Sequence, residues 1–253
     1  MKIIREGNPS PWKEMEGIVR GLIDLIFPPH CAFCGTLLAE DDTAEICPGC
    51  LRNIRFISPP ICPKCGFPFV MGIGENHLCG QCLRRQWHFG SARALAFYEG
   101  PIREAIHGLK YRGKSFLAKS LAGLFERGYP FIDYGSYDLL VPVPLHPKRL
   151  RERGFNQALI LGKAIGRKEE VPCTRFLLKK ISWSPPQIDL SPQEREKNVK
   201  GSFAVTAPGK VRGKRVLLVD DVMTTGATVN ECARELLKAG AEQVDVFTLA
   251  RAV

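Results

Sequence analysis

The stretch Val216-Leu-Leu-Val-Asp-Asp-Val-Met-Thr-Thr-Gly-Ala-Thr228 decides the fold of this 253-residue chain. Its first four residues, 216–219, form a continuous apolar run that is typical of a buried strand. Residues 228–239 have helical spacing and end before a glycine, and residues 244–249 are largely apolar again. The sequence therefore predicts one βαβ unit, with a polar segment at 220–228 between the first strand and the helix.

This polar segment has the chemistry of a sugar-phosphate site. Small and hydroxylated residues at a helix N-terminus offer backbone N–H groups, threonine hydroxyls and the positive end of the helix dipole to a phosphate. Gly226 lets the backbone approach closely. Asp220 and Asp221 repel phosphate, but adjacent carboxylates suit the vicinal hydroxyls of a ribose or a magnesium ion.

The whole stretch resembles, without a gap, the phosphoribosyl-pyrophosphate motif of type I phosphoribosyltransferases. The resemblance implies that Asp220 and Asp221 meet the ribose hydroxyls and that Mg²⁺ binds with the ligand. The residues that would wrap the 5′-phosphate are Thr224, Thr225, Gly226, Ala227 and Thr228. Members of that superfamily that use hypoxanthine or guanine carry an aspartate at the position of Thr224, so threonine argues against those two bases as substrates.

Eight of the ten cysteines form four Cys-x-x-Cys pairs at regular spacing. Two such turns joined by a short hairpin complete a tetrahedral site with four thiolate ligands. Short loops favour pairing between neighbouring turns, while interleaved pairing, disulfides and an iron–sulfur cluster are the alternatives. We predict two structural zinc ions, with the ligands Cys31, Cys34, Cys47, Cys50, Cys62, Cys65, Cys79 and Cys82.

A second strand is predicted at residues 138–143, and a basic segment follows it. Prolines at alternate positions, Pro142 and Pro144, end the strand pairing and fix a turn. In a type I fold the loop after this strand faces the pyrophosphate, where basic side chains would neutralise the leaving group. An exposed basic loop without a ligand is the alternative. The candidate residues of this pyrophosphate loop are Leu145, His146, Lys148, Arg149 and Arg153.

Residues 184–203 form a stretch too charged to be core, which we interpret as a mobile hood over the site, with a plain surface loop as the alternative. Its candidate residues are Gln187, Arg195 and Asn198. Together with Ile106-His-Gly-Leu-Lys-Tyr-Arg-Gly113 and Arg153-Gly-Phe-Asn-Gln157, this stretch resembles the ComF/GntX family of competence-associated, phosphoribosyltransferase-like proteins. The resemblance covers about residues 25–253 and includes the double zinc ribbon.

Membership of that family implies a role in natural transformation, in which incoming single-stranded DNA is handled in the cytosol. It also implies a competence helicase and a recombination mediator as partners. Relatives occur in bacteria that are not known to be competent, so the resemblance does not establish the pathway.

Composition sets further bounds. Hydrophobic residues make up 45% and charged residues 25%, as in a folded globular protein. The apolar stretch 18–27 is interrupted by Arg20 and Asp24, so it predicts a short amphipathic helix rather than a membrane span or a signal core. We therefore expect a cytoplasmic protein without membrane insertion.

The formal net charge of +10 belongs to the middle of the chain, where residues 91–215 carry 24 basic and 11 acidic groups. This excess fits either a phosphorylated ligand or a nucleic-acid surface. Aromatic residues lie between the basic ones, although each is more often a core residue than a stacking platform. They are Phe97, Tyr98, Tyr111, Phe116 and Phe155.

The predicted fold class is α/β. A small cysteine-rich zinc-ribbon domain with an N-terminal helix, residues 1–90, precedes a type I phosphoribosyltransferase-like parallel sheet flanked by helices, residues 91–253. The first functional hypothesis is a phosphoribosyltransferase with an unidentified acceptor and no nameable catalytic base. The second is a non-catalytic sensor or scaffold that binds single-stranded DNA through its ribbons and basic face. A transferase of nucleotide metabolism is a third.

Overall fold

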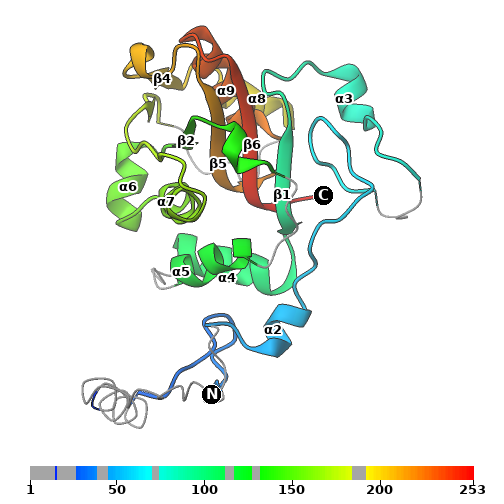
Figure 1. Cartoon of the computed structure of the whole chain (residues 1–253), viewed down its shortest axis with the longest axis vertical. Helices are drawn as coiled ribbons and strands as arrows, with labels where there is room; N and C mark the ends of the chain where they lie inside the picture. The colour runs from blue at the N-terminus through cyan, green and yellow to red at the C-terminus, as the bar shows by residue number, and fades with distance from the viewer. Residues whose placement is uncertain are drawn as a thin grey trace, which may run out of the picture.

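A computed structural model describes residue 15 and residues 27–38, 45–69, 74–111, 117–126, 132–183 and 192–253. The amphipathic helix predicted at 18–27 lies outside these residues except for Phe27. Figure 1 shows a central sheet with helices on its faces and a cysteine-rich N-terminal region that runs along two sides of it. Within the described residues, no helix combines the length and the apolar character that crossing a membrane requires.

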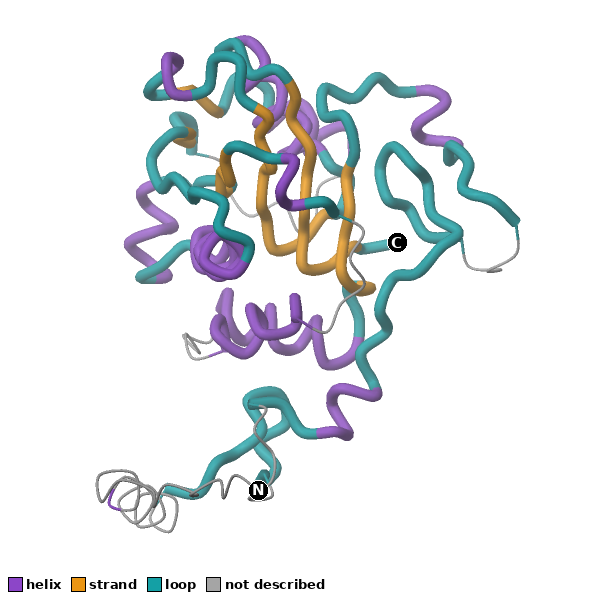
Figure 2. The backbone as a smooth tube through the Cα atoms, viewed as in Figure 1, coloured by secondary structure: helices purple, strands orange, loops and turns teal. Residues whose placement is uncertain are grey.

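The central sheet has four parallel strands in the order β1-β6-β5-β2, labelled in Figure 1. The strands are drawn in orange in Figure 2. Nearly continuous apolar runs form these strands because helices cover the faces of a parallel sheet. The predicted βαβ unit is present, with α9 (Ala227–Lys238) between β5 and β6. The strand bounds are Ala92–Phe97 for β1, Leu139–Pro142 for β2, Arg215–Met223 for β5 and Gln243–Arg251 for β6.

Side chains of β5 alternate between the two faces of the sheet. Leu217 and Val219 pack in the layer of α4 (Gly100–Tyr111), α5 (Leu117–Gly123) and α7 (Gln157–Lys168). Val216 and Leu218 pack in the layer of α9. Because this alternation has a period of two, Asp221 falls on the α4 face and Asp220 on the α9 face.

Strand β5 is longer than its apolar run. It continues through both aspartates to its last residue, Met223, because β6 runs beside it and pairs Asp220 with Thr248 and Met223 with Arg251. The sequence predicts both aspartates in the connection after the strand. The structure corrects this, and the two carboxyl groups therefore project from a hydrogen-bonded strand.

The remaining elements surround this core. Strands β3 and β4 form an antiparallel pair, and α8 and β4 pack against α9. The bounds are Pro48–Arg52 for α2, Gly80–Arg84 for α3, Pro147–Arg153 for α6, Pro192–Val199 for α8, Leu178–Lys180 for β3 and Phe203–Val205 for β4. Short 3-10 turns occupy Leu124–Glu126, Tyr134–Ser136 and Pro208–Lys210.

Candidate functional site

The connection between β5 and α9 is a tight turn. Gly226 is the N-cap of α9 and has a φ of 74°, a left-handed conformation that favours glycine. The amide of Ala227 donates to Oγ1 of Thr225 at 3.4 Å. Because the first turn of a helix leaves N–H groups without intrahelical acceptors, this end of α9 stabilises an anion.

Gly226 also lies in a crowded place. A Cβ on this residue would be 2.8 Å from Cε of Met223 and 3.0 Å from Cζ3 of Trp87. The turn is thus walled by the last residue of β5 and by a tryptophan that comes directly before the sheet domain.

Asp221 forms a largely buried ion pair with Lys110 of α4. The Nζ to Oδ1 distance is 2.8 Å. Burial alone would lower the pKa of Lys110, but the carboxylates of Asp221 and Asp220 raise it above the ordinary value for lysine. Lys110 therefore stays a cation next to the acidic pair.

Asp220 lies on the opposite face, and its Oδ1 accepts a hydrogen bond from the amide of Asp221 at 2.8 Å. Burial and then the Asp221 carboxylate raise the pKa of Asp220 to about 7, although Lys110 acts in the opposite direction. The carboxyl group is therefore poised between its neutral and ionised forms near neutral pH. A bound cation would favour the ionised form.

A second lysine lies within electrostatic reach of Asp220. Burial and then Arg149 lower the pKa of Lys180, whereas Cys232 and Asp220 raise it. Lys180 belongs to β3, on the α9 side of the sheet. Arg149, one of the predicted pyrophosphate residues, is thus brought to the same side as Asp220.

The predicted pyrophosphate loop is mostly a helix. After β2, residues 143–146 form a short connection that includes Leu145 and His146, and α6 begins at Pro147, a residue that favours the first turn of a helix. Nδ1 of His146 caps it by accepting from the amide of Lys148 at 3.3 Å. Proline and the histidine cap therefore convert the expected loop into a helix, which corrects the prediction. The residues that move from loop to helix are Lys148, Arg149 and Arg153.

These α6 cations have different surroundings. Nζ of Lys148 lies 4.7 Å from the ring centroid of Trp183. Nη1 of Arg153 donates to Oε1 of Gln157 at 3.5 Å. Arg149 interacts electrostatically with Lys180, and Lys180 interacts in turn with Asp220 of the acidic pair.

The predicted hood lies partly outside the described residues. Gln187 falls there, Arg195 belongs to α8, and Asn198 is exposed at the end of that helix. Val199 and Phe203 are buried because α8 and β4 pack against α9. The expectation that this whole stretch is too charged for the core is thus wrong at its C-terminal end.

The aromatic residues considered for nucleic-acid contact are mostly not exposed. Phe97 is buried and Phe155 is half-buried. Tyr98 is also half-buried, and the side chain of Tyr111 and all of Phe116 lie outside the described part. Two other rings are open to solvent beside cations. Trp183 is 48% exposed under Lys148, and Phe176 is 71% exposed with Cζ of Arg175 4.8 Å from its centroid.

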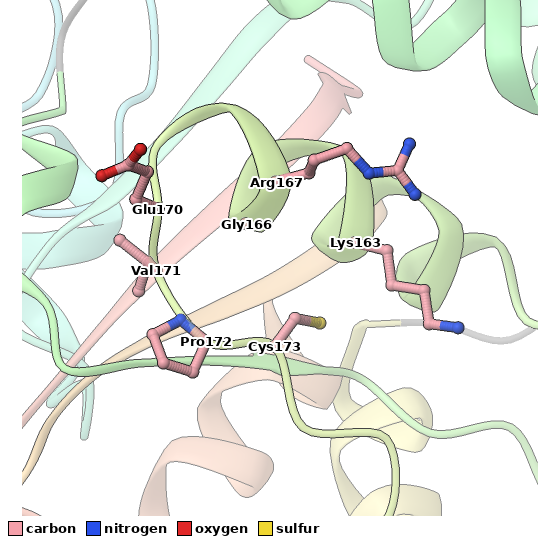
Figure 3. Close-up of a pocket in the computed structure, with 7 residues that line it drawn as sticks. All are labelled: Lys163, Gly166, Arg167, Glu170, Val171, Pro172 and Cys173. Carbon is pink, nitrogen blue, oxygen red and sulfur yellow. The ribbon is translucent and has the colours of Figure 1, made fainter.

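A shallow hollow lies at the end of α7 (Figure 3). Lys163 and Arg167 line it from the helix, and Glu170 and Cys173 line it from the segment that follows. Its described lining includes no residue of the acidic pair, the turn or α6. The hollow is therefore separate from the candidate site.

The cysteines form two quartets from neighbouring turns, as the short loops favour. In each quartet, all four sulfur atoms lie within 4.8 Å of one another. The sulfurs of Cys34 and Cys47 are 3.7 Å apart and those of Cys65 and Cys79 are 3.6 Å apart, close to the about 3.8 Å expected between thiolates around tetrahedral zinc. The residues therefore fit two structural zinc ions without an open coordination position.

A buried arginine supports zinc in the second quartet, which is Cys62, Cys65, Cys79 and Cys82. Arg251 is 3% exposed, and its Nη2 lies 3.6 Å from Sγ of Cys65. Among the described residues, no carboxylate pairs with this guanidinium. Zinc with four thiolates has a net charge of −2, which supplies the counter-charge that a buried guanidinium needs.

Four residues of this region have no site role assigned from the sequence. Lys110 could have been recognised from the sequence, because it lies beside the apolar stripe of α4 and a buried cation there needs an anionic partner. Lys180, Trp87 and Arg251 could not have been recognised, because their partners are remote in the chain.

Two family models match the chain in the order that the fold displays. A model described as a double zinc ribbon domain matches residues 22–83. A model described as a phosphoribosyl transferase domain matches residues 157–252.

Three curated proteins match most of the chain. Competence protein F of Haemophilus influenzae is 30% identical over 82% of this chain and 90% of its own. DNA utilization protein YhgH of Escherichia coli K12 is 33% identical over 90% of this chain and 99% of its own. Competence protein ComFC of Bacillus subtilis is 27% identical over 87% and 94%. With two cysteine quartets in front of a phosphoribosyltransferase domain, the chain belongs to the ComF/GntX family of competence and DNA-utilization proteins.

Proposed function

We propose that the segment Val216–Thr228 binds phosphoribosyl pyrophosphate together with Mg²⁺. The observation that carries this proposal is the acidic pair near the end of β5, followed after residues 222–225 by a left-handed glycine and the N-terminus of α9. In the proposed complex, Asp220 and Asp221 accept from the ribose hydroxyls and hold the magnesium ion. The residues that would bind the 5′-phosphate are Thr224, Thr225, Gly226, Ala227 and Thr228.

The proposed reaction is transfer of the phosphoribosyl group. The acceptor attacks C1′, the bond from C1′ to pyrophosphate breaks, and pyrophosphate leaves with the bonding electrons. Lys180 and Arg149 lie on the Asp220 side and would stabilise the negative charge that develops on the leaving group. The acceptor gives up its proton to solvent as the new bond forms.

Titration calorimetry with phosphoribosyl pyrophosphate and Mg²⁺ tests the ligand. We expect Asp220→Asn/Asp221→Asn to weaken binding by at least about tenfold, because both carboxylates contact the ligand in the proposal. Absence of binding by the wild type would overturn it. Pyrophosphate release is then measured with candidate acceptors. Release would indicate a transferase, and release with a free base would indicate a transferase of nucleotide metabolism. Binding without release would indicate a sensor.

A second candidate function is binding of single-stranded DNA in the cytoplasm during natural transformation. The exposed rings of Trp183 and Phe176, each beside a cation, support it, since bases stack on such rings while cations meet the backbone. Binding of an oligonucleotide that falls steeply with salt and weakens in Trp183→Ala would support this function. By family, a competence helicase and a recombination mediator are the proposed partners.

We further propose that the domain boundary lies near residue 90, with residues 1–90 and 91–253 as the two domains. Limited proteolysis of the full chain that yields a stable fragment starting near residue 90 would support this division. Uniform digestion would contradict it.

A further inference from the structure

Trp87 and Arg251 connect the second cysteine quartet to the turn after β5. We propose that they are positioning residues that couple the second zinc centre to this turn, so that ligand affinity at the turn depends on that centre more than on the first. The inference rests on the ligand proposed above. Neither residue is a metal ligand. Trp87 contacts the quartet and faces the turn, and Arg251 contacts the quartet and Met223, the last residue of β5.

Trp87 makes the shorter connection. Its Nε1 donates to Sγ of Cys82 at 3.2 Å. The far edge of the same indole faces Gly226, with Cζ3 3.0 Å and Cη2 3.2 Å from where a Cβ would be. The ring of Phe89, with its centroid 5.0 Å away, and the guanidinium of Arg85, 4.2 Å from the centroid, hold the indole in this orientation. One rigid side chain therefore spans the distance from a zinc ligand to the turn.

Arg251 makes the second connection. Its Nη1 donates to the carbonyl oxygen of Cys65 at 2.7 Å and lies 3.1 Å from Sδ of Met223. Met223 ends β5, and its methyl group is the closest atom to the Cβ position of Gly226, at 2.8 Å. The guanidinium thus contacts both the second quartet and Met223, the residue that packs against the turn.

Hydrogen bonds also join the second ribbon and the segment after it to α9 and to β1. The amide of His88 donates to Oδ1 of Asn230 in α9 at 2.7 Å. The amide of Ala92 donates to the carbonyl of Lys64 at 2.8 Å, and a Cβ on Gly66 would come within 2.4 Å of the Ala92 carbonyl oxygen. A change in the quartet is therefore passed on to the start of α9.

Loss of the second zinc ion would remove both connections at once. Trp87 would lose a thiolate acceptor held in place by the metal, and Arg251 would lose its counter-charge. The turn would then be less preorganised for an anion, and ligand affinity would fall. Because coupling is reciprocal, bound ligand would also slow the release of this zinc ion.

Zinc release from the zinc-loaded full chain tests this coupling. Release to 4-(2-pyridylazo)resorcinol is followed with Mg²⁺ present, with and without phosphoribosyl pyrophosphate, while alkylation and mass spectrometry identify the exposed cysteines. We expect the ligand to slow release from the second quartet at least threefold and from the first quartet less. In Trp87→Phe, which keeps a ring but loses the N–H donor, the slowing should shrink. Leu83→Ala, an exposed neighbour on α3, is the matched control.

Two outcomes separate this inference from the proposed function. If the wild type binds the ligand and both quartets release zinc at ligand-independent rates, the coupling is overturned and the ligand stands. If the wild type does not bind the ligand, the proposed function is overturned, and hydrogen exchange tests the coupling without it. Exchange in residues 223–230 should rise at least threefold in Trp87→Phe but stay unchanged in Leu83→Ala. Equal exchange in both variants would overturn the coupling.

Discussion

The two cysteine quartets have nearly the same local structure. In each, the amide of the third cysteine donates to the sulfur of the first, from Cys47 to Cys31 at 3.3 Å and from Cys79 to Cys62 at 3.4 Å. In each, a glycine with positive φ follows the second cysteine. The difference lies in what surrounds them, since the first quartet packs in the layer of α4 and α5 and the second packs in the layer of α9.

This difference shows that two zinc sites with the same ligands can contact different parts of the sheet domain. The first ribbon reaches the sheet domain through contacts such as the hydrogen bond from Ser120 to Glu45, at 2.7 Å. The second ribbon reaches the turn itself through Trp87 and Arg251. Each ribbon also lies in the layer that one aspartate faces, with Asp221 on the first side and Asp220 on the second. Four changes test how far this division holds.

The largest effect should come from removing a single cysteine ligand, tested in one quartet at a time. Cys65→Ser should lose the second zinc ion and more than about 4 kcal/mol of unfolding free energy, because structural zinc contributes directly to folding. Cys34→Ser replaces an exposed cysteine and should lose less unfolding free energy than Cys65→Ser. The factor by which it weakens ligand binding should be at least about tenfold smaller. Zinc content, urea unfolding and ligand titration measure these quantities. Equal losses of affinity in both variants would abolish the proposed difference between the ribbons.

Lys110 tests how far the α4 layer stabilises the acidic pair. Lys110→Met leaves Asp221 buried without its cation, so we expect a loss of about 3 kcal/mol in unfolding free energy. Asp221→Asn in the same background should recover part of it, because the uncompensated charge is gone. Urea unfolding of the two single variants and the double variant measures the coupling. Additive losses would show that the ion pair contributes nothing of its own.

The two positive-φ glycines give a matched pair of substitutions. Gly35→Ala should cost about 1 kcal/mol from backbone strain, since its Cβ would meet nothing within 4 Å. Gly66→Ala should cost about 2 kcal/mol more, because its Cβ would lie 2.4 Å from a backbone oxygen of β1. Thermal unfolding of the zinc-loaded variants measures both losses. Equal shifts in Tm would show that the second ribbon accommodates an added methyl group as easily as the first.

The smallest effect concerns Asp220. Its folded-state pKa of about 7 lies above the ordinary value of 3.8, so the stability it contributes is present at acid pH and is lost as pH rises through 7. Asp220→Asn should therefore raise the unfolding free energy at pH 8 and raise it less at pH 5. Urea unfolding at both values measures this, and a difference that does not depend on pH would contradict it.

Local signals account for the parts of the fold and site that the sequence predicted. The apolar run at 216–219 and the spacing of the cysteine pairs need no distant partner to be recognised. The true end of β5 could not be predicted, because it depends on how far β6 continues beside it. His146 and Pro147 are a helix-start signal that is visible in the sequence, although the fold resemblance favoured a loop at this place.

The residues that complete the site depend on contacts between distant segments. Lys110 and Asp221 are 111 positions apart, and Arg251 and Cys65 are 186 positions apart. No pattern within a helix or strand specifies such a pair. Burial of a lone cation indicates that a partner exists but does not identify it.

The position of β6 has a consequence for synthesis. This strand lies between β1 and β5 but follows both in the chain. A ribosome therefore releases all eight cysteine ligands and both neighbouring strands before the strand that joins them. The ribbons can bind metal while the sheet is still in two parts, and Arg251 arrives after that. A nascent chain whose second quartet had no metal would have to bury this guanidinium without a counter-charge, so completion of the sheet would select for chains that already hold zinc.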